Sequence, residues 1–155
     1  MKDGLHVDEN GNKKWYLNNE LHRTDGPGIE YANGRKEWRL NGKLHRENGP
    51  AIEDINDNNY WFLQGLFHRD NGPAVIRANG DKSWFLHGQL HRENGPAVEK
   101  ANGDKYWFLN GKKHREDGPA IEHTDGPKKW FLNGKEYTED QFILTTSKFW
   151  QKVSS

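Results

Sequence analysis

Five copies of a His-Arg-acid string carry the residue types most able to do chemistry in this chain. The histidines are each followed by an arginine, and an acidic residue comes one or two positions after it; they are His22, His45, His68, His91 and His114. Imidazole, guanidinium and carboxylate groups together could bind a metal ion, transfer protons or hold a phosphate. The string returns every 23 residues, however, and a fixed period of this length indicates repeat architecture rather than one active site.

The spacing of the histidines argues against a metal centre. In an antiparallel ribbon with two strands per repeat, neighbouring histidines would lie about 10 Å apart. Zinc ligands each approach the ion to about 2.1 Å, so such histidines could not share one. In a parallel β-solenoid the spacing would be about 4.8 Å, and sharing would be feasible. We expect structural histidines that hydrogen-bond to loop backbone.

No motif of a known catalytic type accompanies the repeated string. The sequence contains no HExxH, paired-cysteine, EF-hand or P-loop pattern, and no serine lies in a G-x-S-x-G setting. We therefore predict no enzyme activity, no catalytic residue, no metal site and no cofactor.

A nucleotide-like anion is the best small-ligand alternative. Each repeat also carries a tryptophan, which could stack on a base while His and Arg hold a phosphate. The acid beside each arginine weakens its field and argues against this role. The candidate ligand-binding residues are Trp61, His68, Arg69, Trp84, His91 and Arg92.

Composition excludes several classes of partner. Lys plus Arg and Asp plus Glu number 23 each in 155 residues, so no basic field would attract nucleic acid. The absence of cysteine, of an apolar leader and of any long apolar run predicts a cytoplasmic protein without membrane contact. Only 32% of the residues are hydrophobic, which suits a repeat protein whose units each bury a thin strip.

The elements that position these residues follow from one repeat, residues 102–124. Asn102-Gly103 and Asn110-Gly111 are both typical of two-residue type I′ hairpin turns. The segment DKYWFL between them is rich in strand formers, and Pro119 precedes a second strand. We predict an all-β fold, an elongated antiparallel β-ribbon of 23-residue repeats, with a β-solenoid as the alternative.

The ends of the chain depart from the repeat. We expect an N-terminal lead-in at 1–9, five to six repeats at 10–136 and a C-terminal helical cap at 137–155. Thr138 and Gln141 have the spacing of a capping box, which predicts the start of a short helix. Four apolar residues then share one helical face, of which the first and last are expected to pack as the cap core: Phe142, Ile143, Phe149 and Trp150.

The segment WFLNGKKHREDGPA at 107–120 resembles the MORN repeat, which is also about 23 residues long. The HR-x-DGPA strings are similar to divergent bacterial and viral variants of that repeat, and the resemblance covers residues 10–136. It implies an antiparallel β-ribbon that binds and inhibits a partner protein in phage–host or toxin–antitoxin conflict. The stretches KKWYLNN and KYWFLNG also resemble choline- and glucan-binding repeats, which use aromatic cages.

The repeat at residues 56–78 and its borders (the Trp61 repeat) differ from the others by gaining apolar residues. Leu66 stands where other repeats have a polar residue, Ile76 where they have Glu, and Ile55 where most have a small residue. Apolar residues at exposed positions indicate an interface. The candidate protein-binding residues are Ile55, Tyr60, Phe62, Leu66, Phe67, Ile76 and Phe85.

A row of aromatic residues adds a reason to expect a partner. The side chains opposite the tryptophan face include four successive phenylalanines; the row is Tyr16, Arg39, Phe62, Phe85, Phe108 and Phe131. Exposure of so much apolar surface is unfavourable. We expect the sheet itself, a partner protein or a second copy in a homodimer to cover it.

Overall fold

The computed structural model describes the backbone of residues 3–153 and the side chains of residues 3–147. Contacts divide the chain into two compact units, Met1–Gly88 and Gln89–Ser155. Both units are built from short antiparallel hairpins, and the described chain ends in one helix. The predicted all-β fold with a C-terminal helix is thus confirmed.

The strands are mostly two residues long. Those of the first unit are β1 (Gly4–Val7), β2 (Lys13–Leu17), β3 (Glu20–Leu21), β4 (Ile29–Glu30), β5 (Lys36–Glu37), β6 (Arg39–Leu40), β7 (Lys43–Leu44), β8 (Ile52–Glu53), β9 (Asn59–Tyr60), β10 (Phe62–Leu63), β11 (Leu66–Phe67), β12 (Val75–Ile76), β13 (Lys82–Ser83) and β14 (Phe85–Leu86). Those of the second are β15 (Gln89–Leu90), β16 (Val98–Glu99), β17 (Lys105–Tyr106), β18 (Phe108–Leu109), β19 (Lys112–Lys113), β20 (Ile121–Glu122), β21 (Trp130–Leu132) and β22 (Lys135–Tyr137), followed by helix α1 (Glu139–Val153).

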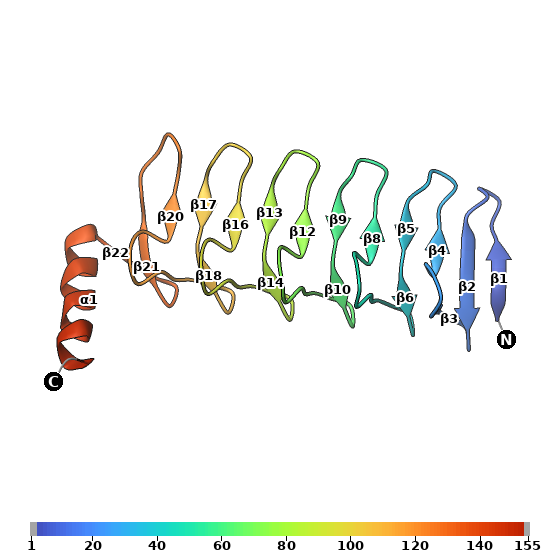
Figure 1. Ribbon diagram of the computed structural model, residues 1–155, viewed down its shortest axis with the longest axis horizontal. Coiled ribbons are helices and arrows are strands. Elements are labelled where there is room, and N and C mark those ends of the chain that lie inside the picture. The colour runs from blue at the N-terminus through green and yellow to red at the C-terminus, as the bar shows by residue number, and fades with distance from the viewer. Residues whose placement is uncertain (1–2, 154–155) are drawn as a thin grey trace. The chain divides into compact units, whose positions relative to one another are not determined.

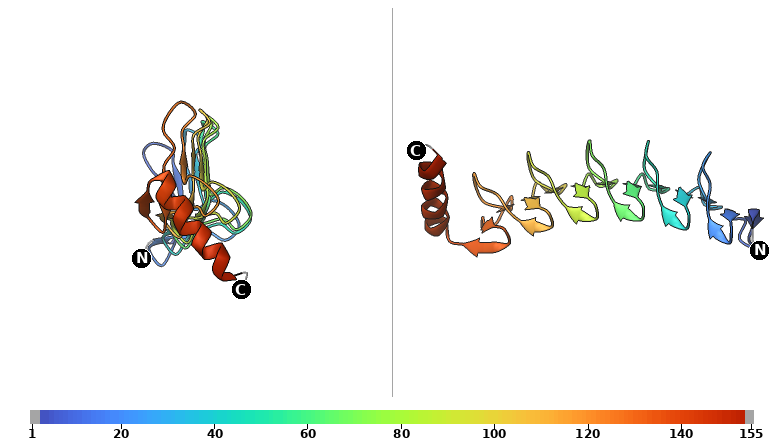
Figure 2. Two further views of the ribbon diagram at one scale, coloured as in Figure 1. Left: turned by 90° about the vertical axis from the view of Figure 1, so that its left-hand side faces the viewer. Right: turned by 90° about the horizontal axis from the view of Figure 1, so that it is seen from below.

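Each repeat contributes two strands to a main sheet, as β8 and β9 do (Figure 1). In the first unit the strand order is β1-β2-β4-β5-β8-β9-β12-β13, and in the second it is β16-β17-β20. Every pairing described within the two units is antiparallel, which favours the ribbon over the parallel solenoid. The repeats of the first unit overlie one another in the left-hand view of Figure 2, as expected for translated copies.

The aromatic segment of a repeat changes its partner at the tryptophan. Lys105–Tyr106 (β17) belongs to the main sheet, whereas Phe108–Leu109 (β18) pairs back onto Lys112–Lys113 (β19). Between them, the Trp107 amide donates to the Ala120 carbonyl at 2.8 Å, and its carbonyl accepts from the His114 amide at 3.2 Å. A repeat therefore consists of two sheet strands and a smaller hairpin, rather than the single long strand expected for DKYWFL.

The two turns of a repeat differ in type, which corrects one expectation. At Asn110 and Gly111, φ is 49° and 75°, as a type I′ turn requires. At the other end only the glycine is left-handed, with Gly103 at φ 93°, and its amide donates to the Lys100 carbonyl. This pattern is a three-residue loop in which a type I turn is followed by a left-handed glycine.

The core is thin. Small residues in it directly precede the sheet strand that follows each repeat proline. Four alanines that follow the repeat prolines are 0% exposed: Ala51, Ala74, Ala97 and Ala120. In the second unit Ala120, Ile121 and Phe131 form a buried cluster, with Tyr106 and Trp107 packed against it. The alanine side chain lets neighbouring chain segments approach closely, so this position has no room for a larger residue.

Helix α1 begins with the predicted capping box. The Gln141 amide donates to Thr138 Oγ1 at 3.3 Å, and the Thr138 amide donates to Gln141 Oε1 at 3.1 Å. Phe142 is buried as expected, but Ile143 is 54% exposed and lies outside the core. Phe149 and Trp150 lie outside the described side chains.

The N-terminal segment belongs to the main sheet. Residues 4–7, expected as a lead-in, form β1, which pairs with β2 through four residues. Within the described part of the chain, no helix is long and apolar enough to cross a membrane.

Candidate functional site

The guanidinium groups of the repeat arginines lie over the rings of the repeat tryptophans. The guanidinium carbon lies 4.1 Å from the ring centroid for Arg23 on Trp15, 3.7 Å for Arg46 on Trp38, 4.1 Å for Arg69 on Trp61 and 4.0 Å for Arg115 on Trp107. Each arginine also donates to the carbonyl of the proline four residues later, at 3.1 Å for Arg69 and Pro73. Cation–π stacking and this hydrogen bond hold the loop against its own strand.

The acid that pairs with most of these arginines is seven residues away. Arg46, Arg92 and Arg115 form ion pairs of 2.8, 2.7 and 2.7 Å, with Glu53, Glu99 and Glu122 respectively. Arg23 lies 3.5 Å from Glu30 in the same arrangement.

The acids directly after these arginines have a different partner from the one expected. Glu47, Asp70 and Glu116 each lie near the histidine two residues earlier, with Asp70 3.2 Å from His68 Nε2. Asp25 and Asp117, at the second position after the arginine, do pair with Arg23 and Arg115. The neighbouring acid therefore cancels the arginine charge in only some repeats.

The repeat histidines connect successive repeats. Nδ1 accepts the backbone amide of the left-handed turn residue one repeat further on, at 3.2 Å for His68 and His87, and at 3.0 Å for His114 and Asn133. His45 and His91 accept in the same way from Gln64 and Asn110. The repeats therefore use histidine as a structural acceptor, and the described side chains contain no group of three His, Cys, Asp or Glu residues that could hold a metal ion.

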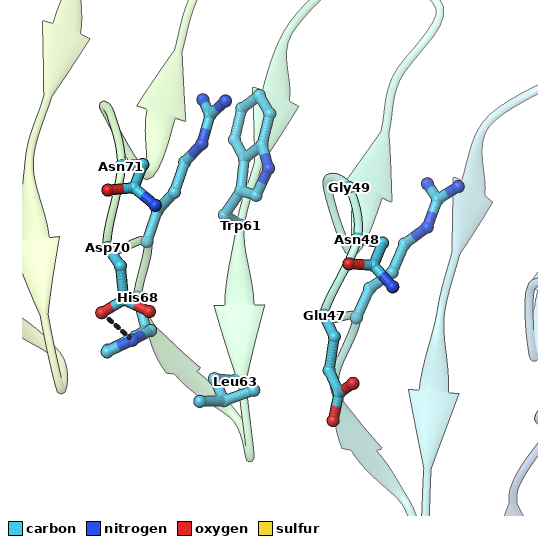
Figure 3. A pocket seen from close by; sticks show the side chains of 10 residues that line it. Glu47, Asn48, Gly49, Trp61, Leu63, His68, Asp70 and Asn71 are labelled. Carbon is cyan, nitrogen blue, oxygen red and sulfur yellow. Dashed lines mark ion pairs between the residues drawn. The ribbon is translucent and has the colours of Figure 1, made fainter.

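Grooves open beside Trp38, Trp61 and Trp107, on the face that carries the arginines. The groove at Trp61 has a volume of about 570 Å³ and extends to Asn48 and Gly49 of the preceding repeat (Figure 3). Equivalent grooves at Trp38 and Trp107 have volumes of about 450 and 730 Å³. Three of the predicted ligand-binding residues, Trp61, His68 and Arg69, line this one groove.

The other predicted ligand-binding residues belong to different units. Trp84 lies in the first unit, whereas His91 and Arg92 lie in the second. Within the second unit, Arg92 lines the Trp107 groove. The structure therefore brings together half of this predicted set.

The opposite face carries a column of stacked aromatic rings. Phe67 stacks on Phe62 at 4.1 Å between centroids and on Phe85 at 5.0 Å, and Tyr60 lies 6.4 Å from Phe67. Phe67 thus fills the space between phenylalanines of successive repeats. Beside the column lies a hollow of about 220 Å³ with apolar walls from Ile52, Tyr60, Phe62 and Phe67, and a polar rim from Arg35 and Asp54. We name this feature the aromatic hollow.

The remaining predicted protein-binding residues do not join the aromatic column. Ile55 is 58% exposed at the turn between β8 and β9, and Leu66 is 51% exposed on β11. Ile76 lies opposite Asn59, whereas its neighbour Val75 lies opposite Tyr60. Because side chains alternate along a strand, Ile76 faces away from Tyr60 and lies on the tryptophan face.

A buried charged cluster escaped the sequence analysis. The carboxylate of Glu37, 3% exposed, accepts hydrogen bonds from Arg35 at 2.7 Å, from Arg39 Nε and Nη2 at 2.9 and 2.7 Å, and from the Tyr31 hydroxyl at 3.1 Å. Burial and the Glu37 carboxylate raise the pKa of Tyr31. The sequence does contain a signal for this cluster. Three charged residues within five positions depart from the repeat pattern: Arg35, Glu37 and Arg39.

Asp104 connects two turns of the second unit and should make its stability depend on pH. Its carboxylate accepts the Thr124 amide at 2.9 Å and lies 3.1 Å from His123 Nδ1. The Thr124 amide, followed by His123, lowers the pKa of Asp104 from 3.8 to about 2. A lowered pKa stabilises the folded state above about pH 4, and this stabilisation is lost as the pH falls toward 2.

We expect the urea midpoint of the second unit to fall between pH 5 and pH 2.5, measured by tryptophan fluorescence. The Asp104→Asn variant should show a smaller fall, because it retains an amide-accepting oxygen but does not titrate. Asp125→Asn, at an exposed position nearby, is the control and should keep the wild-type pH dependence. An equal fall for Asp104→Asn and wild type would show that Asp104 does not cause it.

Two comparisons with known proteins found no match for the chain: no protein-family model matches it, and no curated protein is found to be similar to it.

Proposed function

We propose that the protein is a non-enzymatic repeat protein of MORN-like type that binds a partner protein through the aromatic hollow and thereby inhibits it. The observation that carries the proposal is the hollow itself, whose apolar walls and charged rim match the surroundings of an interface anchor. Binding energy in protein interfaces concentrates in a few aromatic or aliphatic side chains that fill such pockets. The partner would insert one apolar side chain into the hollow, against Tyr60 and Phe67.

The Trp61 repeat supports this assignment because it is the one that differs. Phe67 replaces the leucine found at 21, 44 and 90, and it completes the aromatic column. Leu66, beside it on β11, is also exposed, although alternation along the strand turns its side chain away from Phe67. A role in phage–host or toxin–antitoxin conflict is what the resemblance suggests for such a binder, and a cytoplasmic location fits its lack of cysteine. A second copy of the chain is the alternative occupant.

The test replaces two residues of the Trp61 repeat by their equivalents from the preceding repeat. The double variant Leu66→Lys with Phe67→Leu gives the pair found at Lys43 and Leu44, so the fold should survive. The partner is first identified by native mass spectrometry of protein purified gently from host cells. We expect the double variant to bind that partner at least tenfold more weakly, which corresponds to about 1.4 kcal/mol.

A matched control is Lys43→Gln, which changes the equivalent of Leu66 in the preceding repeat to the residue found at 89. It should bind like wild type. Equal binding by the double variant would overturn the proposal. A bound mass of a few hundred daltons, lost on Arg69→Ala, would instead favour a nucleotide-like ligand in the Trp61 groove.

A further inference from the structure

The tryptophan face carries a ladder of oppositely charged residues across the main sheet. In the first unit the ladder runs Lys13, Glu30, Lys36 and Glu53, each directly opposite the next. In the second unit Lys105 lies opposite both Glu99 and Glu122. Opposite charges at facing positions stabilise neighbouring strands.

In the Trp61 repeat, both members of one facing pair of this ladder are replaced by uncharged residues. Asn59 replaces the lysine, Ile76 replaces the glutamate, and these two residues face each other. The next position in the register, opposite Ile76 on β13, is the exposed Lys82. A neutral and partly apolar step therefore lies beside Lys82, which faces Ile76 where Lys36 and Lys105 face Glu30 and Glu99.

The same replacement leaves Arg69 without the ion pair that its counterparts make. Arg23, Arg46, Arg92 and Arg115 each have a glutamate seven residues on, whereas Arg69 has Ile76. Among residues 3–147, no carboxylate pairs with the Arg69 guanidinium. Its contacts are the Trp61 ring and the Pro73 carbonyl, and the nearby Asp70 lies against His68.

We propose that Arg69, Ile76 and Lys82 form a docking site for an acidic polypeptide segment in which Asp or Glu lies beside an apolar residue. The carboxylate would occupy the place of the missing glutamate, while the apolar side chain packs on Ile76. Arginine binds carboxylates through paired, charge-assisted hydrogen bonds. Stacking on Trp61 already orients the guanidinium, so less conformational entropy is lost on binding.

The negative charge of the groove lining favours a carboxylate over a phosphate as the bound group. Glu47 and Asp70 line the same groove, and a doubly charged phosphate would be repelled by both. A single carboxylate restores the charge balance of the other repeats. The inference rests on the proposed function only in that the occupant is again a polypeptide, since this site and the aromatic hollow lie on opposite faces.

The experiment selects binders from a displayed library of random 12-residue peptides on the full-length chain. We expect enriched peptides to carry Asp or Glu next to Leu, Ile or Phe. These peptides should bind Ile76→Glu at least tenfold more weakly, because the new carboxylate pairs with Arg69. Ile76→Glu restores the residue of four other repeats, so circular dichroism should show an intact fold.

Phe67→Leu, on the opposite face, is the matched control and should leave this binding unchanged. Selection of no peptides, of peptides without acidic residues, or of peptides insensitive to Ile76→Glu would overturn the inference. Peptides that depend on Phe67 and not on Ile76 would overturn it while supporting the proposed function. Displacement by adenosine monophosphate at a lower concentration than by free peptide would overturn it in favour of a nucleotide.

Discussion

Replacement of Glu37 by glutamine is expected to lower the free energy of unfolding of the first unit by about 2–3 kcal/mol. The buried carboxylate accepts hydrogen bonds from Arg35, Arg39 and Tyr31, so its loss leaves two arginines facing each other without a counter-charge. Removal of one partner of a buried ion pair costs more than the pair contributes, since the remaining charge is stranded. The arginine side chains are 39% and 24% exposed, which moderates the loss.

Urea unfolding followed by circular dichroism measures this change. Glu53→Gln is the matched control, because that glutamate pairs with one arginine and its side chain is 37% exposed. Its loss should lie within about 1 kcal/mol. If the two variants were equally stable, the Glu37 cluster would contribute no more than a surface ion pair.

Replacement of Phe131 by alanine is expected to destabilise the second unit by about 3–4 kcal/mol. Phe131 packs with Ala120 and Ile121 in that unit's buried cluster, and Lys113 lies over its ring at 4.8 Å from the centroid. Loss of the ring removes its apolar transfer energy and leaves a cavity beside residues that cannot collapse onto it. The midpoint of urea unfolding at 25 °C, followed by tryptophan fluorescence, measures the loss.

Phe108→Ala provides the comparison within the same unit. Phe108 occupies the same row one repeat earlier, but it is only half-buried, so its loss should be smaller. An equal cost for both variants would show that the row contributes uniformly. A loss below about 1 kcal/mol for Phe131→Ala would contradict its place in the core.

The repeats act as internal controls for function. A substitution in the Trp61 repeat can be reversed to a residue that a sister repeat already tolerates, as in Phe67→Leu or Ile76→Glu. Such variants separate lost binding from lost folding better than alanine substitutions, which remove packing as well as contacts.

The sequence by itself determined the features that are local to one repeat. The 23-residue period, the type I′ turn at Asn110-Gly111 and the capping box of Thr138 and Gln141 were predictable. The period is visible in the spacing of like residues. The turn and the capping box each depend on residues within four positions of one another, whose backbone preferences and short-range hydrogen bonds are set by residue type.

Only the tertiary structure decided which side chains meet. The sequence marked Ile76 as unusual and grouped it with Phe67, but the register places these residues on opposite faces. It placed an acid beside each repeat arginine, whereas Arg46, Arg92 and Arg115 pair with a glutamate seven residues away. It gave no partner for Glu37. Contacts of this kind depend on strand register and on alternation between faces, so a shift of one residue would exchange every partner.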